Sequence, residues 1–135
     1  KNTALHCACT GGRVRIIEYL LANEADINAR DQNNETPIFA AVNNQQLDAL
    51  DILLRHDKLN IYAKSSNRSL TVMHFACGKS SHLFAKFILD SLPSPHKLLK
   101  MKDVQGKTPI FSASLYQRPE IVKLLLERNA SPNAR

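Results

Sequence analysis

TALHCA at residues 3–8 begins a pattern that recurs as TPIFAA at 36–41, TVMHFA at 71–76 and TPIFSA at 108–113. The leading threonines lie 33, 35 and 37 residues apart. A second apolar run follows each stretch at a matching distance: IIEYLL at 16–21, ALDILL at 49–54, FAKFIL at 84–89 and IVKLLL at 121–126. Chance does not place eight blocks in such register, so we interpret the chain as four copies of one structural unit.

The residues of one copy predict a pair of short helices. Threonine is a preferred N-cap residue, and Pro37 and Pro109 follow it at the first helical position, where a missing N–H costs nothing. The second run has apolar residues at i, i+1, i+4 and i+5, which give a helix one wide apolar face. Two such helices cannot bury both faces alone, so we expect the core to form between stacked copies.

The copies resemble the ankyrin repeat, which has a period of 33 residues and the signature Thr-Pro-Leu-His-x-Ala. The first copy is the most similar, since Gly12, the pair Leu20-Leu21 and ADINA at 25–29 follow TALHCA. The resemblance covers essentially the whole chain. It implies an all-α solenoid of stacked helix–turn–helix units with projecting hairpin loops. It also implies one domain over residues 1–135, with repeats at about 1–33, 34–68, 69–105 and 106–135.

Several positions depart from the family pattern. Phe39 and Phe111 replace the signature histidine, so we expect two repeats to lack the hydrogen bond that this histidine makes to neighbouring loops in the family. Three residues stand where the family usually has glycine at a helix end: Glu24, Asp57 and Asn129. A left-handed backbone there would cost an ordinary residue about 1–2 kcal/mol, although asparagine tolerates it better.

Repeat lengths and chain ends carry further expectations. The second and third repeats exceed 33 residues by two and four. The surplus of the third falls within residues 91–98, which contain two prolines and are predicted to be a loop. The chain ends near the start of another hairpin, and its last helix keeps an apolar run although terminal repeats usually carry polar caps. We therefore expect it to be a piece of a longer protein.

Composition limits the possible functions. Hydrophobic residues make up 44% and charged residues 22%, which is typical of a globular domain. No stretch reaches the roughly 18 apolar residues that a membrane span needs, so membrane insertion is not expected. The net charge of +6 favours acidic partners. An odd, small number of cysteines suits a reducing compartment, so we expect the cytoplasm, with the nucleus as an alternative.

No catalytic site is predicted. His6 and His74 occupy the structural histidine position of the repeat. Cys9 and Cys77 occupy equivalent positions two repeats apart, about 20 Å, so they are expected to be core residues rather than disulfide partners or metal ligands. The resemblance places Cys7 toward the groove that hairpins and first helices form in this family. Phosphate-loop, serine-nucleophile and zinc-protease motifs do not occur. We predict no catalytic residue, metal, cofactor or small-molecule substrate.

Two residues are candidates for modification. Ser94, followed by Pro95, resembles a proline-directed phosphorylation site. Asn28 occupies the hairpin position that some ankyrin proteins offer to an asparaginyl hydroxylase. A purely structural role is the favoured interpretation of both.

The resemblance also implies a binding surface, because hairpin tips and first helices form a concave face in this family. The residues that map to this face are Gln32, Asn33, Glu35, Asn43, Asn44, Asn67, Arg68, Leu70, Lys79, Val104, Gln105, Lys107, Leu115 and Tyr116. Leu70, Leu115 and Tyr116 are apolar where the repeat needs no core residue, as binding hot spots are. The basic members favour an acidic partner.

We therefore predict a non-catalytic protein–protein interaction module, or scaffold, that binds a partner protein across repeats two to four. An acidic surface on that partner is one option. The alternative is a targeting or regulatory arm of a larger enzyme, including a secreted effector, whose catalytic domain lies outside this chain. Nucleic-acid binding through the basic stretch from Lys97 to Lys107 is a third hypothesis, against which the lack of clustered aromatic residues argues.

Overall fold

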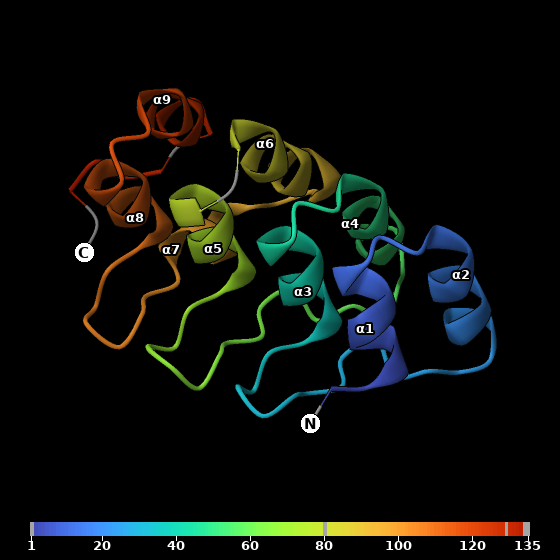
Figure 1. Cartoon of the computed structure of the whole chain (residues 1–135). Coiled ribbons are helices and arrows are strands. Elements are labelled where there is room, and N and C mark those ends of the chain that lie inside the picture. The colour runs from blue at the N-terminus through green and yellow to red at the C-terminus, as the bar shows by residue number, and fades with distance from the viewer. Residues whose placement is uncertain (1, 80, 129, 134–135) are drawn as a thin grey trace.

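The computed structural model describes residues 2–79, 81–128 and 130–133, which form nine α-helices and no strands. The helices are α1 (Ala4–Thr10), α2 (Val14–Ala22), α3 (Pro37–Asn43), α4 (Leu47–Leu54), α5 (Val72–Lys79), α6 (His82–Ser91), α7 (His96–Lys100), α8 (Pro109–Leu115) and α9 (Pro119–Glu127). Figure 1 shows the first helix of each pair in one row and the second in another, with hairpin loops projecting from the first row. The all-α repeat stack that the sequence predicts is confirmed. None of the helices in the described residues has the length and hydropathy of a membrane span.

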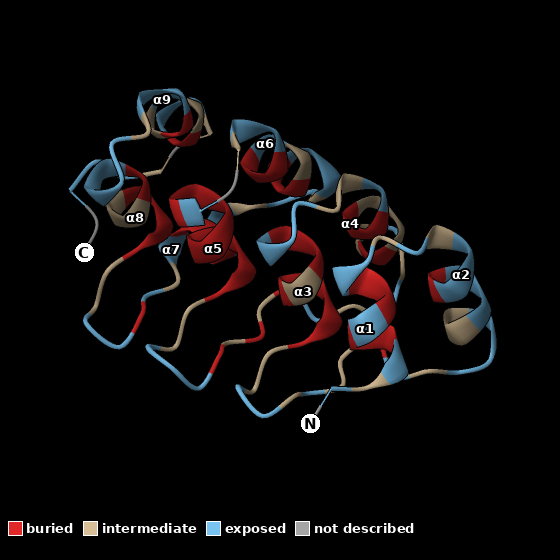
Figure 2. Cartoon of the chain, in the orientation of Figure 1, coloured by how far each residue is buried: buried red, intermediate tan, exposed pale blue. Residues whose placement is uncertain are grey.

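The core runs along the stack rather than within one pair of helices. In each row, every first or second helix contacts its counterpart in the next repeat. Ile38 of α3, Leu53 of α4, Met73 of α5 and Ile88 of α6 are completely buried and belong to one hydrophobic cluster. The buried faces therefore turn toward one another along the whole array (Figure 2). Each unit depends on its neighbours for burial, as the apolar pattern predicts.

Two histidines link their helices to the following hairpin. Thr3 Oγ1 accepts from the His6 backbone N–H, while the Thr3 N–H donates to His6 Nδ1. Because Nδ1 accepts, the ring proton lies on Nε2, which donates to the Glu35 carbonyl at 2.9 Å. His74 makes the same bonds with Thr71 and, at 3.0 Å, with the Lys107 carbonyl. Both histidines are buried, so their predicted structural role is confirmed.

The second repeat lacks this arrangement, because Phe39 stands in place of the histidine. Thr36 Oγ1 is buried and has no hydrogen-bond partner among the described residues. The Phe39 ring instead packs edge-on against Phe75, with ring centroids 5.2 Å apart. The substitution therefore exchanges a polar link for aromatic packing.

Replacing the capping threonine should consequently have different effects in two repeats. Thr71→Val removes the hydrogen bonds to His74 and should lower the free energy of unfolding by about 1–3 kcal/mol. Thr36→Val removes a buried hydroxyl without a partner, and should leave stability unchanged or raise it. Urea denaturation of both variants measures this difference, and equal losses would contradict the assignment.

The turn between paired helices uses a left-handed residue. Gly12, Gln45 and Gln117 occupy equivalent positions in three repeats, with φ of 63°, 54° and 55°. Glycine adopts this conformation without strain, whereas a residue with a side chain is disfavoured. Glu24 is left-handed as predicted, with φ of 64°.

The same expectation for Asp57 is wrong, because the two helix ends close differently. After α2, the Ala25 N–H donates back to the Leu20 carbonyl, which requires the left-handed residue between them. After α4, the Lys58 N–H donates to His56 Nδ1 instead, and Asp57 has no positive φ. Asn129 lies outside the described residues.

The predicted loop at residues 91–98 is partly helical. Ser91 ends α6, and His96 to Leu98 belong to α7. Both prolines precede α7, where a missing N–H does not interrupt helical bonding. The helix buries Leu98 and Leu99, and this burial explains why the insertion is ordered against the stack. Lys97 Nζ lies 4.2 Å from the centroid of the Tyr62 ring.

Glycine in the turn after α3 should stabilise the protein. Gln45→Gly removes the strain of a left-handed residue with a side chain and should raise the free energy of unfolding by up to about 1 kcal/mol. Asn44→Gly is the matched control, since Asn44 has φ of −101° and its Nδ2 donates to the Ala40 carbonyl. The control should destabilise. Thermal denaturation distinguishes the two, and a destabilised Gln45→Gly variant would contradict the prediction.

Candidate partner-binding groove

A hollow of about 400 Å³ lies between the hairpins and the first helices of repeats two to four, and we call it the groove. Its lining residues are Asn33, Glu35, Asn43, Asn67, Arg68, Leu70, His74, Phe75, Gly78, Lys79, Asp103, Lys107, Phe111, Ser112, Leu115 and Tyr116. Ten of the fourteen residues predicted for the concave face are among them. The other four lie outside the groove: Gln32, Val104 and Gln105 in the hairpins, and Asn44 at the C-cap of α3.

The hairpins that form one wall are held by short polar side chains. Asp31 Oδ1 accepts from the backbone N–H of Asn33 at 2.8 Å and of Glu35 at 2.9 Å. Asp103 Oδ1 accepts from the N–H of Gln105 and Lys107 at the same two distances. These bonds fix the backbone from which the Glu35 and Lys107 side chains extend.

Neighbouring hairpins are also bonded to each other. The Ser66 N–H donates to the Asn33 carbonyl, and the Val104 N–H donates to the Arg68 carbonyl, both at 2.8 Å. Arg68 Nη2 lies 3.9 Å from Asp103 Oδ2, so an ion pair joins the same two loops. The wall of the groove is therefore a bonded series of loops, which preserves the spacing of its side chains.

The sequence prediction missed six lining residues: His74, Phe75, Gly78, Asp103, Phe111 and Ser112. Five of them belong to α5 or α8, where the repeat pattern reads as core. Gly78 could have been found, since a small residue near a helix end permits close approach. A Cβ atom on Gly78 would lie 3.1 Å from Tyr116 Cε2, so the ring rests directly on α5.

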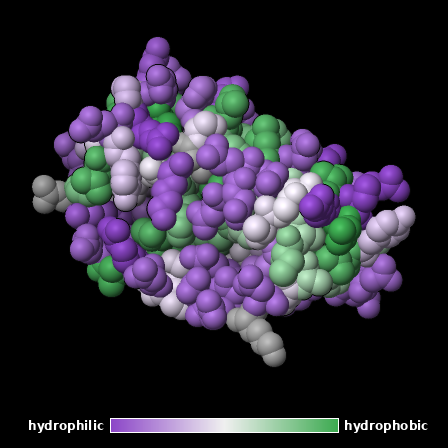
Figure 3. Space-filling model, in the orientation of Figure 1, coloured by the Kyte–Doolittle hydropathy of each residue, from purple (hydrophilic) through white to green (hydrophobic). Residues whose placement is uncertain are grey.

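Leu115 and Tyr116 supply apolar surface at one end of the groove. Leu115 is 57% exposed and Tyr116 is 49% exposed, although one edge of the Tyr116 ring packs against Gly78. Tyr116 therefore packs against a helix of the preceding repeat and is still half-exposed. Figure 3 shows that polar side chains cover most of the face seen in Figure 1, with apolar ones between them. This mixture suits recognition of another molecule.

Titratable groups in the groove are shaped by burial. Desolvation lowers the pKa of His74, so this imidazole stays neutral near pH 7 while it bonds to Lys107. Burial raises the pKa of the Glu35 carboxyl, and the negative charge of the neighbouring Asp31 raises it further. The positive charge of Lys79 lowers this pKa and offsets part of the rise. No group of three or more metal-ligating side chains occurs among the described residues. The His74 ring and the Asp103 carboxylate of the groove are already hydrogen-bonded within the fold.

The two candidates for modification have different surroundings. The Asn28 side chain donates to the Lys58 carbonyl and accepts from the Asn60 N–H, both at 2.7 Å, so it joins two loops. Ser94 is exposed between α6 and α7. Neither residue lines the groove.

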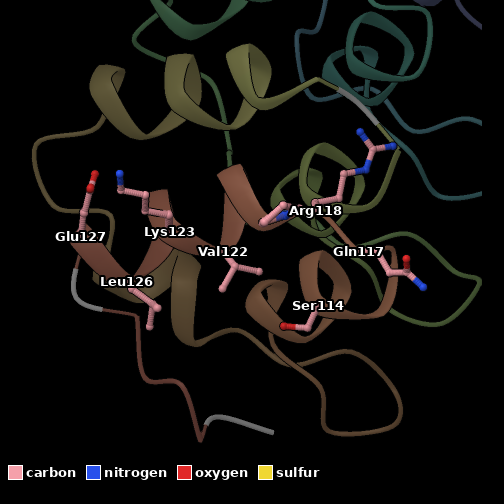
Figure 4. A pocket seen from close by; sticks show the side chains of 8 residues that line it. Ser114, Gln117, Arg118, Val122, Lys123, Leu126 and Glu127 are labelled. Carbon is pink, nitrogen blue, oxygen red and sulfur yellow. The ribbon is translucent and has the colours of Figure 1, made fainter.

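A second, more open hollow lies on α8 and α9 (Figure 4). Val122 and Leu126, one turn apart, project side by side from α9, and Leu126 is 43% exposed. Arg118, Lys123 and Glu127 line the same hollow. None of the predicted concave-face residues lies there.

Comparisons with known proteins extend over the whole chain. A family model of ankyrin repeats in three copies matches residues 1–65 and 58–135. The chain is 26% identical over 125 residues to the human transient receptor potential cation channel subfamily A member 1, covering 93% of this chain and 11% of that protein. An ankyrin repeat-containing protein of Schizosaccharomyces pombe is 28% identical over 110 residues, covering 78% of this chain and 45% of that protein. The Drosophila melanogaster channel subunit of the same name is 29% identical over 112 residues, covering 82% of this chain and 9% of that protein. The chain thus spans less than half of each of these relatives.

The three cysteines differ in surroundings, and this difference predicts their reactivity. Cys7 is exposed, whereas Cys9 and Cys77 are completely buried. Burial raises the pKa of the Cys9 thiol to about 12 and also raises the pKa of Cys77. Only Cys7 should therefore react rapidly with Ellman's reagent in the native protein, and all three should react in concentrated guanidinium chloride. Rapid native reaction of a second thiol would contradict the predicted packing.

Proposed function

Because the chain belongs to the ankyrin-repeat family, whose repeats generally mediate protein–protein interactions, we propose that it binds a partner protein through the groove. The observation that carries this proposal is the arrangement of exposed polar, basic and apolar side chains around one preformed hollow. Leu115 and Tyr116 provide exposed apolar area beside basic groups, which is the composition of binding hot spots.

The rigidity of the groove supports the proposal. Its floor is formed by first helices that pack within the core, and its wall is a bonded series of hairpins. A surface that is already ordered loses little conformational entropy when a partner binds. A disordered loop, in contrast, would lose conformational entropy on binding, and this loss would weaken the affinity.

The state of the polar groups supports binding rather than catalysis. The His74 ring is engaged at both nitrogens, and one oxygen of Asp103 accepts two backbone N–H groups. A general base needs an available lone pair close to a substrate proton. The exposed side chains of the groove that a partner protein could contact include Arg68, Lys79, Leu115 and Tyr116. We also propose that the chain works in a reducing compartment, either the cytoplasm or the nucleus, because it has few cysteines.

Affinity capture with matched variants tests the proposal. Arg68→Glu combined with Tyr116→Ala alters the groove, whereas Arg15→Glu combined with Tyr19→Ala alters an equivalent pair on α2, where Arg15 lies 6.0 Å from the Tyr19 ring centroid. Wild type and the α2 variant should retain the same protein from a cell lysate, and the groove variant should lose it. Circular dichroism must show that all three are folded. Equal retention by the groove variant would place the binding surface elsewhere.

A further inference from the structure

The charges around the groove are unequal in number and in availability. Its lining includes three cationic side chains, Arg68, Lys79 and Lys107, and two carboxyl groups, Glu35 and Asp103. Asp103 is only 8% exposed. Its Oδ1 accepts two backbone N–H groups, and its Oδ2 faces Arg68 at 3.9 Å. Both oxygens of the Asp103 carboxylate therefore already interact with the hairpins of the protein itself.

The two lysines are differently placed, because each lies over an aromatic ring. Lys79 Nζ is 5.4 Å from the centroid of Phe75, and Lys107 Nζ is 4.2 Å from that of Phe111. Neither ammonium group lies within 4.0 Å of a carboxylate oxygen among the described residues. A ring face orients an ammonium group without neutralising its charge. Both charges are thus directed into the groove and remain available to an anion.

An apolar patch adjoins these charges. The Tyr116 ring rests on Gly78, one residue before Lys79, and Leu115 is exposed beside it. Leu70, which follows the second hairpin, is partly buried and lines the same hollow. A ligand that fills the groove therefore meets fixed cations and exposed apolar surface within one hollow.

We propose that the groove recognises an acidic peptide segment of its partner, whose Asp or Glu carboxylate binds Lys79 and Lys107 while an adjacent apolar side chain packs on Leu115 and Tyr116. This inference rests on the proposed function, and it specifies the chemistry of the partner. The carboxylate would complement two ammonium groups that form no close ion pair among the described residues, although the more distant Glu35 carboxyl attracts Lys79. Burial between the two lysines strengthens the attraction.

A polynucleotide fits these observations less well. Glu35 and Asp103 line the same hollow and would oppose a continuous row of phosphates. Single-stranded nucleic acid also requires several aromatic faces for stacking, and Phe75 is buried, which leaves Tyr116 as the most exposed ring in the lining. A single carboxylate between two lysines requires neither a groove free of negative charge nor several exposed aromatic rings.

Selection from a random peptide library displayed on phage tests the inference, with the purified 135-residue chain as bait. Wild type should select peptides in which Asp or Glu adjoins a Leu, Phe or other large apolar residue. A synthetic copy of the selected peptide then serves as the probe for titration. Lys79→Gln and Lys107→Gln should each weaken its binding about tenfold, as the loss of one charged contact does. Glu35→Gln should strengthen binding, because it removes a competing negative charge.

The outcomes separate this inference from the proposed function. An acidic and apolar consensus that both lysine variants weaken, but Arg15→Gln does not, supports the inference. A neutral or basic consensus that Tyr116→Ala still weakens overturns the inference and leaves binding at the groove intact. Peptides that no groove variant affects contradict both. Tight binding of a polyuridine oligonucleotide that excludes the peptide overturns the inference in favour of nucleic acid.

Discussion

Stacking between neighbouring first helices is the contact on which the remaining structure depends. Each helix has only about two turns, so its own backbone bonds and caps cannot hold it in isolation. Burial of residues such as Ile38 and Met73 between repeats orders the helices, and the helices in turn fix both ends of every hairpin. His6 and His74 strengthen this dependence, because each ring bonds to a carbonyl of the next hairpin. The groove inherits its shape from these contacts, since its floor and wall belong to elements that the stack has already ordered.

The stack itself could be read from the sequence because local and long-range signals agree. A capping threonine, a proline at the first helical position and a regular apolar spacing all predict the same helices. The prediction failed where a local rule competes with packing. Prolines at residues 93 and 95 indicate a loop, yet α7 forms after them because Leu98 and Leu99 can be buried. Asp57 aligns with a left-handed position, but α4 ends at Leu54 and closes with different bonds. Neither the formation of α7 nor the end of α4 follows from the repeat alignment alone, since both depend on where the extra residues of a repeat pack against the stack.

The groove was predictable to the extent that it follows from the repeat. Hairpin and first-helix positions such as Glu35, Lys79 and Lys107 could be placed because their register is fixed by the threonines. The contact of Tyr116 with Gly78 could not, because it depends on the distance between α5 and α8 and on a missing side chain. The position of each lysine over an aromatic ring could not be predicted from the sequence either, since the repeat pattern assigns Phe75 and Phe111 to the core. Phe111 is in fact only partly buried, and it presents its ring to Lys107.

In two of the hairpins, the side chains that hold the turn differ from the side chains that extend into the groove. Asp31 and Asp103 point into their own turns and accept backbone N–H groups, so another residue there would have to replace those bonds. Glu35 and Lys107 occupy the same position relative to these aspartates, and both make their hydrogen bonds within the fold through the backbone N–H and carbonyl. Their side chains can therefore differ in charge without disturbing the hairpin, as this pair already does. The sign of the electrostatic potential in the groove is consequently set at positions that stacking does not constrain. The shape of the groove, in contrast, is fixed by stacking.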